Sequence, residues 1–294
     1  MEGKKVCSYK IIPPKTNLNK ITIHTNFGER KKNVYPGDKE LLLKRGNDPN
    51  ERVEVIGKGA NGEIYLISWG GKKPASIVFK YPTTDPEFEV NAAKNILGDY
   101  HHFVIPYRII YDQYENPFII MQEANGDVDS LLTQNKLTKR FKNQMIFHYV
   151  EAIGKLWNHS KIVFSDMKTQ NLLYQCHDDG INFYFGDIGA FSKNGMREYD
   201  YEVEPPECKG EIDKNFCLFT IGLLIISIYE FEYDRPMKDG QGFEDLFYHP
   251  IKDQIDLHIG NPILKRMAKK LLALDPTFRN ENSVNTVVNL ILGK

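Results

Sequence analysis

Four polar residues near the middle of the chain have types and spacing that could support chemistry. Asp166 is followed by Lys168 and then by Asn171, and a second acid, Asp187, stands in the sequence Gly-Asp-Ile-Gly. Metal-assisted phosphoryl transfer requires a carboxylate to accept a proton, an amine to neutralise phosphate, and carboxylate and amide oxygens to hold a metal ion. We therefore take this region as the first candidate for an active site.

Motifs elsewhere in the chain occur in an order that fits the same chemistry. A glycine cluster at 57–62 lies between two predicted strands, and Lys80 ends a third. Pro205-Pro206-Glu207 and the segment 274–279, Leu-Asp-Pro-Thr-Phe-Arg, follow the central residues. Over residues 50 to 290 the chain resembles the eukaryotic-type Ser/Thr protein kinases, in which these motifs recur. The resemblance implies an α+β, bilobal fold with a small β-rich N-lobe and a larger helical C-lobe.

The resemblance also implies roles for the central residues. Asp166 would act as catalytic base for a substrate hydroxyl, and Lys168 would neutralise the transferred phosphoryl group. Asn171 and Asp187 would hold Mg²⁺, with ATP as the second cofactor.

The remaining roles concern the nucleotide and one structural ion pair. Lys80 would pair with the phosphates and with a helix glutamate, for which Glu89 is preferred and Glu87 is the alternative. The implied nucleotide contacts are Ile56, Gly57, Gly59, Gly62, Ile64, Lys80, Met121, Gln122, Ala124 and Asp127, with Asp129 as an alternative for the ribose. In the family, the glutamate and arginine of the two late motifs form a buried ion pair, which here would join Glu207 to Arg279.

Several positions depart from the family pattern. Phe164-Ser165 replaces the usual His-Arg before the catalytic Asp, and Ile188 replaces the Phe after the second acid. Without that arginine, a phosphate on the activation loop loses its main partner, so we expect activity without activation-loop phosphorylation. Cys217 stands where an Asp usually supports the catalytic loop, and Asp213 is a candidate to replace it in part. Phe164 is expected to contribute apolar contacts.

The hydrophobic pattern predicts the elements that must position these residues. Strands are predicted at 53–56, 63–67, 75–80, 103–111 and 117–121, with a helix at about 86–97. Further helices are predicted at 141–158, 216–230 and 261–274. We divide the chain into a basic N-terminal extension at 1–50, an N-lobe at 51–123 and a C-lobe at 124–294. The extension could be a solvated basic tail, or it could dock on the body, form a homodimer or bind DNA.

Composition limits the class of protein. The 294 residues carry 38 Lys and Arg against 39 Asp and Glu, a net charge of -1, which gives no global attraction to nucleic acid or membranes. The longest apolar run, 217–226, is too short to cross a bilayer and predicts a buried helix. With four scattered cysteines and no signal peptide, we expect reduced thiols in an intracellular protein, in the cytoplasm or nucleus.

Local charge suggests the substrate. Acidic residues are concentrated at 198–211, next to the expected peptide site, and would attract a basic, Arg-rich protein. The compact size and basic leader resemble divergent viral kinases such as the late protein kinase of baculoviruses, which implies a DNA-packaging protein as substrate and a host-cell location. Two alternatives remain open: a pseudokinase that serves as a nucleotide-binding scaffold, and a small-molecule phosphotransferase.

Overall fold

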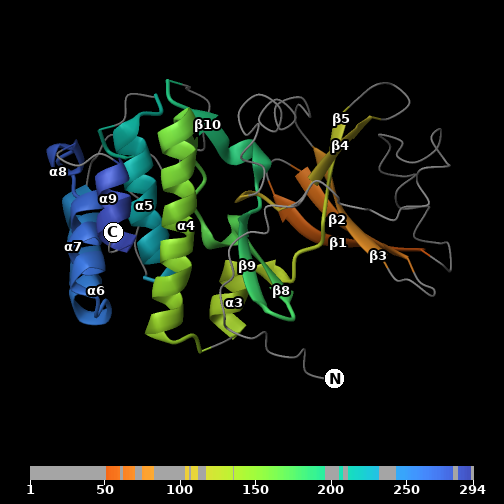
Figure 1. Ribbon diagram of the computed structural model, residues 1–294, viewed down its shortest axis with the longest axis horizontal. Helices are drawn as coiled ribbons and strands as arrows, with labels where there is room; N and C mark the ends of the chain where they lie inside the picture. Colours follow the sequence, from red (N-terminus) through yellow and green to blue (C-terminus); the bar gives the residue numbers. More distant parts are fainter. Residues whose placement is uncertain are drawn as a thin grey trace. The chain divides into compact units, whose positions relative to one another are not determined.

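The computed structural model describes residues 51–59, 62–69, 75–82, 103–105, 107–111, 117–134, 136–195, 205–207, 211–231, 243–280 and 284–292 (Figure 1). These residues combine antiparallel sheets with helices, a mixed architecture compatible with the α+β class. They belong to two compact units that divide between Ala124 and Asn125. The extension at 1–50 and the predicted helix at 86–97 lie outside the described residues.

The unit that ends at Ala124 contains a five-stranded antiparallel sheet of order β1-β2-β3-β5-β4. Its strands are β1 (Glu51–Gly59), β2 (Gly62–Trp69), β3 (Ala75–Pro82), β4 (Tyr107–Tyr111) and β5 (Pro117–Met121). Along β2, Tyr65 and Ile67 are fully buried, while Ile64, Leu66 and Ser68 are partly exposed. This alternation is typical of a sheet with one buried face. The predicted strands are confirmed, except that 103–105 is not part of β4.

Helices dominate the unit that begins at Asn125. They are α3 (Val128–Gln134), α4 (Lys139–Ser160), α5 (Lys214–Ile228), α6 (His249–His258), α7 (Pro262–Leu271), α8 (Thr277–Asn280) and α9 (Val284–Leu292), with a π-helical turn, η8 (Phe243–Tyr248), before α6. In Figure 1, α4, α5 and α9 lie side by side. The predicted helices at 141–158, 216–230 and 261–274 are confirmed as α4, α5 and α7, with shifted ends.

Apolar sequence and polar caps explain the two longest helices. Every residue of α5 from Phe216 to Ile226 is buried, as its continuous apolar run predicts. Helix α4 begins where the Thr138 hydroxyl accepts a hydrogen bond from the Phe141 amide, 3.2 Å away. It ends at Lys161, whose left-handed backbone lets its amide bond the carbonyls of the last turn.

Two small sheets complete this unit and carry the candidate site. One has the order β6-β8-β9, from β6 (Gly126–Asp127), β8 (Leu172–His177) and β9 (Gly180–Phe185). The other pairs β7 (Ile162–Phe164) with β10 (Phe191–Lys193) in antiparallel register, with Phe191 opposite Phe164. The segment 165–171 therefore runs from one sheet to the other.

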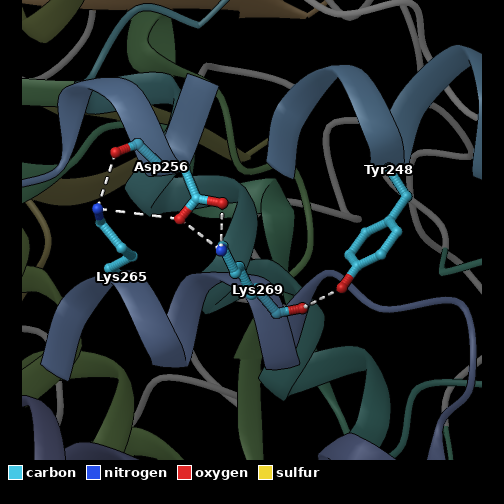
Figure 2. A network of polar contacts seen from close by, with 4 residues as sticks. All are labelled: Tyr248, Asp256, Lys265 and Lys269. Atoms are coloured by element: carbon cyan, nitrogen blue, oxygen red, sulfur yellow. Dashed lines mark hydrogen bonds and ion pairs between the residues drawn. The ribbon is translucent and has the colours of Figure 1, made fainter. Parts of the chain in front are cut away.

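Charged and polar side chains join α6, α7 and η8 at the surface (Figure 2). Lys269 donates to both carboxylate oxygens of Asp256 at 2.5 Å, and Lys265 donates to the Asp256 carbonyl at 2.8 Å. The Lys269 hydrogen bond lowers the pKa of Asp256. The Tyr248 hydroxyl donates to the Lys269 carbonyl over 3.3 Å. Because the Asp256 carboxylate is exposed to solvent, which screens its charge, these ion pairs contribute little to stability.

The described helices and two of the cysteines can be compared with the expectations from the sequence. Within the described part of the chain, every helix is too short or too polar to span a membrane. Cys217 is a free, buried thiol, and burial raises its pKa far above the usual range. Cys176 is disulfide-bonded, so the expectation of four reduced thiols is wrong at that position.

Candidate functional site

The segment between β7 and β8 folds into a tight loop that ends in a 3-10 turn, η5 (Thr169–Asn171). The Lys168 amide bonds the Asp166 carbonyl at 3.1 Å, and the Asn171 amide bonds the Lys168 carbonyl at 3.0 Å. Met167 is buried, 2% exposed, between the two charged residues. The buried Met167 side chain anchors the loop, and the backbone turns bring the side chains of Asp166 and Lys168 into contact.

The side chains of Asp166, Lys168 and Asn171 converge on one carboxylate oxygen. The Lys168 ammonium lies 2.6 Å from Asp166 Oδ2, and the Asn171 amide nitrogen donates to the same oxygen at 2.6 Å. The Asn171 amide nitrogen also lies 3.1 Å from the Asp166 carbonyl. The Asp166 side chain is only 10% exposed and that of Lys168 is 39% exposed. A nearly buried carboxylate held by charge-assisted hydrogen bonds is well oriented for acid–base chemistry.

Asp187 is held beside this loop through the backbone on both of its flanks. The Gly186 amide donates to the Asn171 carbonyl at 2.7 Å, and the Ser165 amide donates to the Ala190 carbonyl at 2.8 Å. The Asp187 carboxylate accepts a hydrogen bond from the Gly189 amide at 3.2 Å, which caps the 3-10 turn η6 (Ile188–Ala190). The structure thus brings all four central residues of the sequence motif together within one unit.

Gly186 is required where the Asp187 segment meets the loop. A Cβ at this position would lie 2.7 Å from Leu173 Cγ and 3.3 Å from the Asn171 carbonyl oxygen. We expect Gly186→Ala to destabilise the protein by about 1–3 kcal/mol, because the buried contact must shift, and to lower activity because Asp187 moves with it. Urea unfolding measures the loss of stability, and the rate of phosphoryl transfer measures the loss of the expected activity. Gly260→Ala is the matched control, since a Cβ there meets no atom within 4 Å; equal effects of both changes would contradict this assignment.

The positions that depart from the family pattern are well packed. Phe164 is 1% exposed and its ring centroid lies 4.6 Å from that of Phe185 and 5.0 Å from that of Phe191. Ile188 is 2% exposed. The predicted apolar role of Phe164 is confirmed, because aromatic rings at these separations stabilise a core.

The support predicted for the loop at Asp213 has a different form. The Asp213 carboxylate accepts a hydrogen bond from the Phe216 amide at 2.8 Å and so caps α5. Cys217 is completely buried in the same helix, which packs against β7 and η5. Asp213 therefore caps a helix, and the loop is supported by the packing of α5.

Asp127 and Asp129, the two candidates for the ribose, lie at the start of α3, and each accepts a hydrogen bond. Asp127 Oδ1 accepts a hydrogen bond from the Ser130 amide at 2.6 Å, as an N-cap does. Asp129 Oδ1 accepts from the Thr169 hydroxyl at 2.8 Å, which joins α3 to the loop. Sequence reasoning missed Thr169; the only signal was a hydroxyl residue within the loop motif.

The predicted ion pair of the late motifs is confirmed. Glu207 pairs with Arg279, which is completely buried. Arg279 also donates to the Ala273 carbonyl at 2.8 Å, and its guanidinium lies 5.3 Å from the ring centroid of Phe219. Burial lowers the pKa of Arg279 and the Glu207 carboxylate opposes that shift. A buried arginine with a counter-charge and a carbonyl acceptor fits the requirements for a stable interior charge.

The residues predicted to contact a nucleotide belong to the other unit, apart from Asp127. Gly57, Gly59 and Gly62 lie in the hairpin of β1 and β2, where Gly57 pairs with Ile64 and Gly59 pairs with Gly62. A shift in register places Ile56 at a bulge, and its side chain is 49% exposed.

Four more of the predicted nucleotide contacts lie in β3, at the end of β5 and just after it. Lys80 is half-buried in β3, opposite Ile64 and Ile119, and Met121 is 7% exposed. After β5, Gln122 is exposed and Ala124 is half-buried. Glu87 and Glu89 lie outside the described residues.

The donor groups near Asp187 fit a magnesium ion better than a fully protein-ligated metal. Within the described residues, His, Cys, Asp and Glu side chains form no cluster of three or more that could hold a metal ion. Mg²⁺ is typically held by one or two carboxylates together with substrate phosphates and water. The Asp187 carboxylate and the Asn171 amide oxygen supply that partial set.

Comparisons with known proteins leave the family of the chain unassigned. No protein-family model matches the sequence. No curated protein matches it either. The function is therefore inferred from the geometry of the site and from the motifs.

Proposed function

We propose that this chain is a Ser/Thr protein kinase of bilobal fold, which transfers the γ-phosphoryl group of Mg-ATP to hydroxyls of a basic, Arg-rich protein. One observation carries the proposal. Asp166, Lys168 and Asn171 share hydrogen bonds and an ion pair, and the Asp187 segment is bonded to both ends of their loop. Phosphoryl transfer depends on such positioning and on charge stabilisation more than on covalent chemistry by the protein.

In the proposed reaction each of these residues has a task. Asp166 orients the substrate hydroxyl and accepts its proton, and the Lys168 and Asn171 contacts fix the carboxylate for that step. Lys168, partly exposed, can also neutralise the transferred group. Asp187 and Asn171 would hold Mg²⁺, which when bound neutralises charge on the phosphates. Lys80 would pair with the phosphates, and the β1–β2 hairpin would cover them.

The same packing supports activity without phosphorylation of the activation segment. Ser165 bonds the Ala190 carbonyl with its amide and its hydroxyl, so this position makes neutral hydrogen bonds inside the protein. The acidic residues expected to select a basic substrate are mostly outside the described residues; Glu211, at the end of that stretch, is exposed.

A transfer assay tests the proposal. The protein is incubated with Mg-ATP labelled at the γ-phosphate and with an Arg-rich peptide containing one Ser, and label is expected on that Ser. The same peptide with Ala in place of Ser is the control. Binding of Mg-ATP without transfer would instead favour the pseudokinase scaffold, and labelling of choline or an aminoglycoside but of no protein would favour the small-molecule phosphotransferase.

A further inference from the structure

The Ala190 carbonyl accepts two hydrogen bonds from a single residue. The Ser165 amide lies 2.8 Å from this oxygen and the Ser165 hydroxyl lies 2.9 Å from it. Both residues are buried, 2% and 6% exposed. A carbonyl oxygen has two lone pairs, so both bonds can form together. The hydroxyl bond is additional, because the amide bond merely continues the ladder that pairs Phe164 with Phe191.

This contact connects the two segments that carry the acids of the candidate site, Asp166 and Asp187. Ser165 directly precedes Asp166, and Ala190 ends the 3-10 turn that Asp187 caps. On the other side of Asp187, the Gly186 amide bonds the Asn171 carbonyl. The turn that carries Asp187 is therefore fastened to the first and last residues of the loop that carries Asp166, Lys168 and Asn171.

We propose that Ser165 is a positioning residue, whose hydroxyl sets the Asp187 turn against the catalytic loop through the Ala190 carbonyl. The proposal rests on the proposed function and deepens it. Neither partner titrates or carries charge, so the contact forms without a phosphate or a change of protonation. The Ser165 hydroxyl is buried and donates to the Ala190 carbonyl, so its role is to fix the distance between the proton acceptor and the carboxylate that would hold Mg²⁺.

Replacing Ser165 by Ala isolates the hydroxyl, because the Ala190 carbonyl keeps its bond from the residue 165 amide. A net hydrogen bond of this kind corresponds to about a two- to tenfold change in an equilibrium constant. We expect Ser165→Ala to raise by that factor the Mg²⁺ concentration needed for half-maximal binding of a fluorescent ATP analogue. The same shift is expected in the Mg²⁺ dependence of transfer, with kcat recovering at saturating Mg²⁺. Ser165→Thr, which keeps the hydroxyl, should restore most of the Mg²⁺ affinity.

Thr220→Val is the matched control. The Thr220 hydroxyl is also buried and donates to a carbonyl, that of Cys217, at 2.8 Å, but this bond lies within α5. All proteins are treated with a protein phosphatase before measurement. Thr220→Val should lose comparable stability and leave the Mg²⁺ dependence unchanged.

The outcomes separate the two proposals. A wild-type protein that neither binds Mg-ATP nor transfers phosphate overturns the proposed function and the positioning role with it. The positioning role alone is overturned if the wild-type protein transfers phosphate but Ser165→Ala has the same Mg²⁺ dependence. It is also overturned if the Mg²⁺ dependence of Ser165→Ala shifts only as far as that of Thr220→Val. Binding of Mg-ATP without transfer overturns the catalytic proposal, and the shift in Mg²⁺-dependent binding still decides the role of Ser165.

Discussion

Replacing Asp166 by Asn is expected to reduce phosphoryl transfer by about 10²–10⁴-fold, because the side chain can no longer accept the proton of the substrate hydroxyl. The amide oxygen of Asn can still accept from Lys168 and Asn171, which both donate to Asp166 Oδ2. The loop should therefore keep its shape. Measurement of kcat with the Arg-rich Ser peptide, together with the unfolding midpoint, separates lost chemistry from lost structure.

Asp178→Asn provides the control for this loss. The Asp178→Asn substitution removes the same negative charge, but Asp178 is exposed at the turn between β8 and β9. We expect its kcat to match the wild type, and we expect Asp166→Asn to bind Mg-ATP about as well as the wild type because Asp187 and Lys80 are intact. Retention of more than a tenth of the transfer rate by Asp166→Asn would show that another group accepts the proton.

Much of the candidate site could be predicted because its signal is local. Asp166, Lys168 and Asn171 lie within six residues, and the tight loop around the buried Met167 brings these neighbours together. The buried helix α5 was equally predictable, since a continuous apolar run leaves no polar face to expose. The ion pair of Glu207 and Arg279 joins distant residues, and only the family resemblance predicted it.

The elements that sequence reasoning missed are those in which local preference and tertiary packing compete. Helix α9 has the sequence Val-Asn-Thr-Val-Val-Asn-Leu-Ile-Leu, whose β-branched residues favour a strand, yet it forms a helix packed against α4 and α7. The β8–β9 hairpin had a readable signal in Asp178-Asp179-Gly180, where Gly180 has φ of 154°.

Other roles could not be read from residue types at all. Asp127 and Asp213 are acids near the predicted site, and the structure shows each of them accepting a backbone amide at the start of a helix. Acids are common at both catalytic and capping positions, so the type alone does not distinguish the two. The contact of Ser165 with Ala190 joins residues 25 positions apart. It depends on the pairing of β7 with β10, and strands of only three residues are too short to be predicted from the sequence pattern.

Replacing Arg279 by Met is expected to destabilise the protein by about 3–5 kcal/mol, because it breaks a buried ion pair. The change also removes the hydrogen bond to the Ala273 carbonyl and the contact with the Phe219 ring. For a unit of this size, the loss corresponds to a fall in the unfolding midpoint of about 10 °C. The proposed transfer activity should fall as well, since Glu207 loses the ion pair that anchors the segment 205–207.

Two further variants show whether the ion pair itself causes this loss. Arg266→Met removes an exposed arginine of α7 and should change stability by no more than about 0.5 kcal/mol. Glu207→Gln, alone and combined with Arg279→Met, completes a double-mutant cycle in urea unfolding. If the pair carries the stability, the double variant is less destabilised than the sum of the single variants, because neither partner is left with an unpaired charge. Strict additivity would assign the loss to the packing of Arg279 on Phe219 and to its carbonyl contacts.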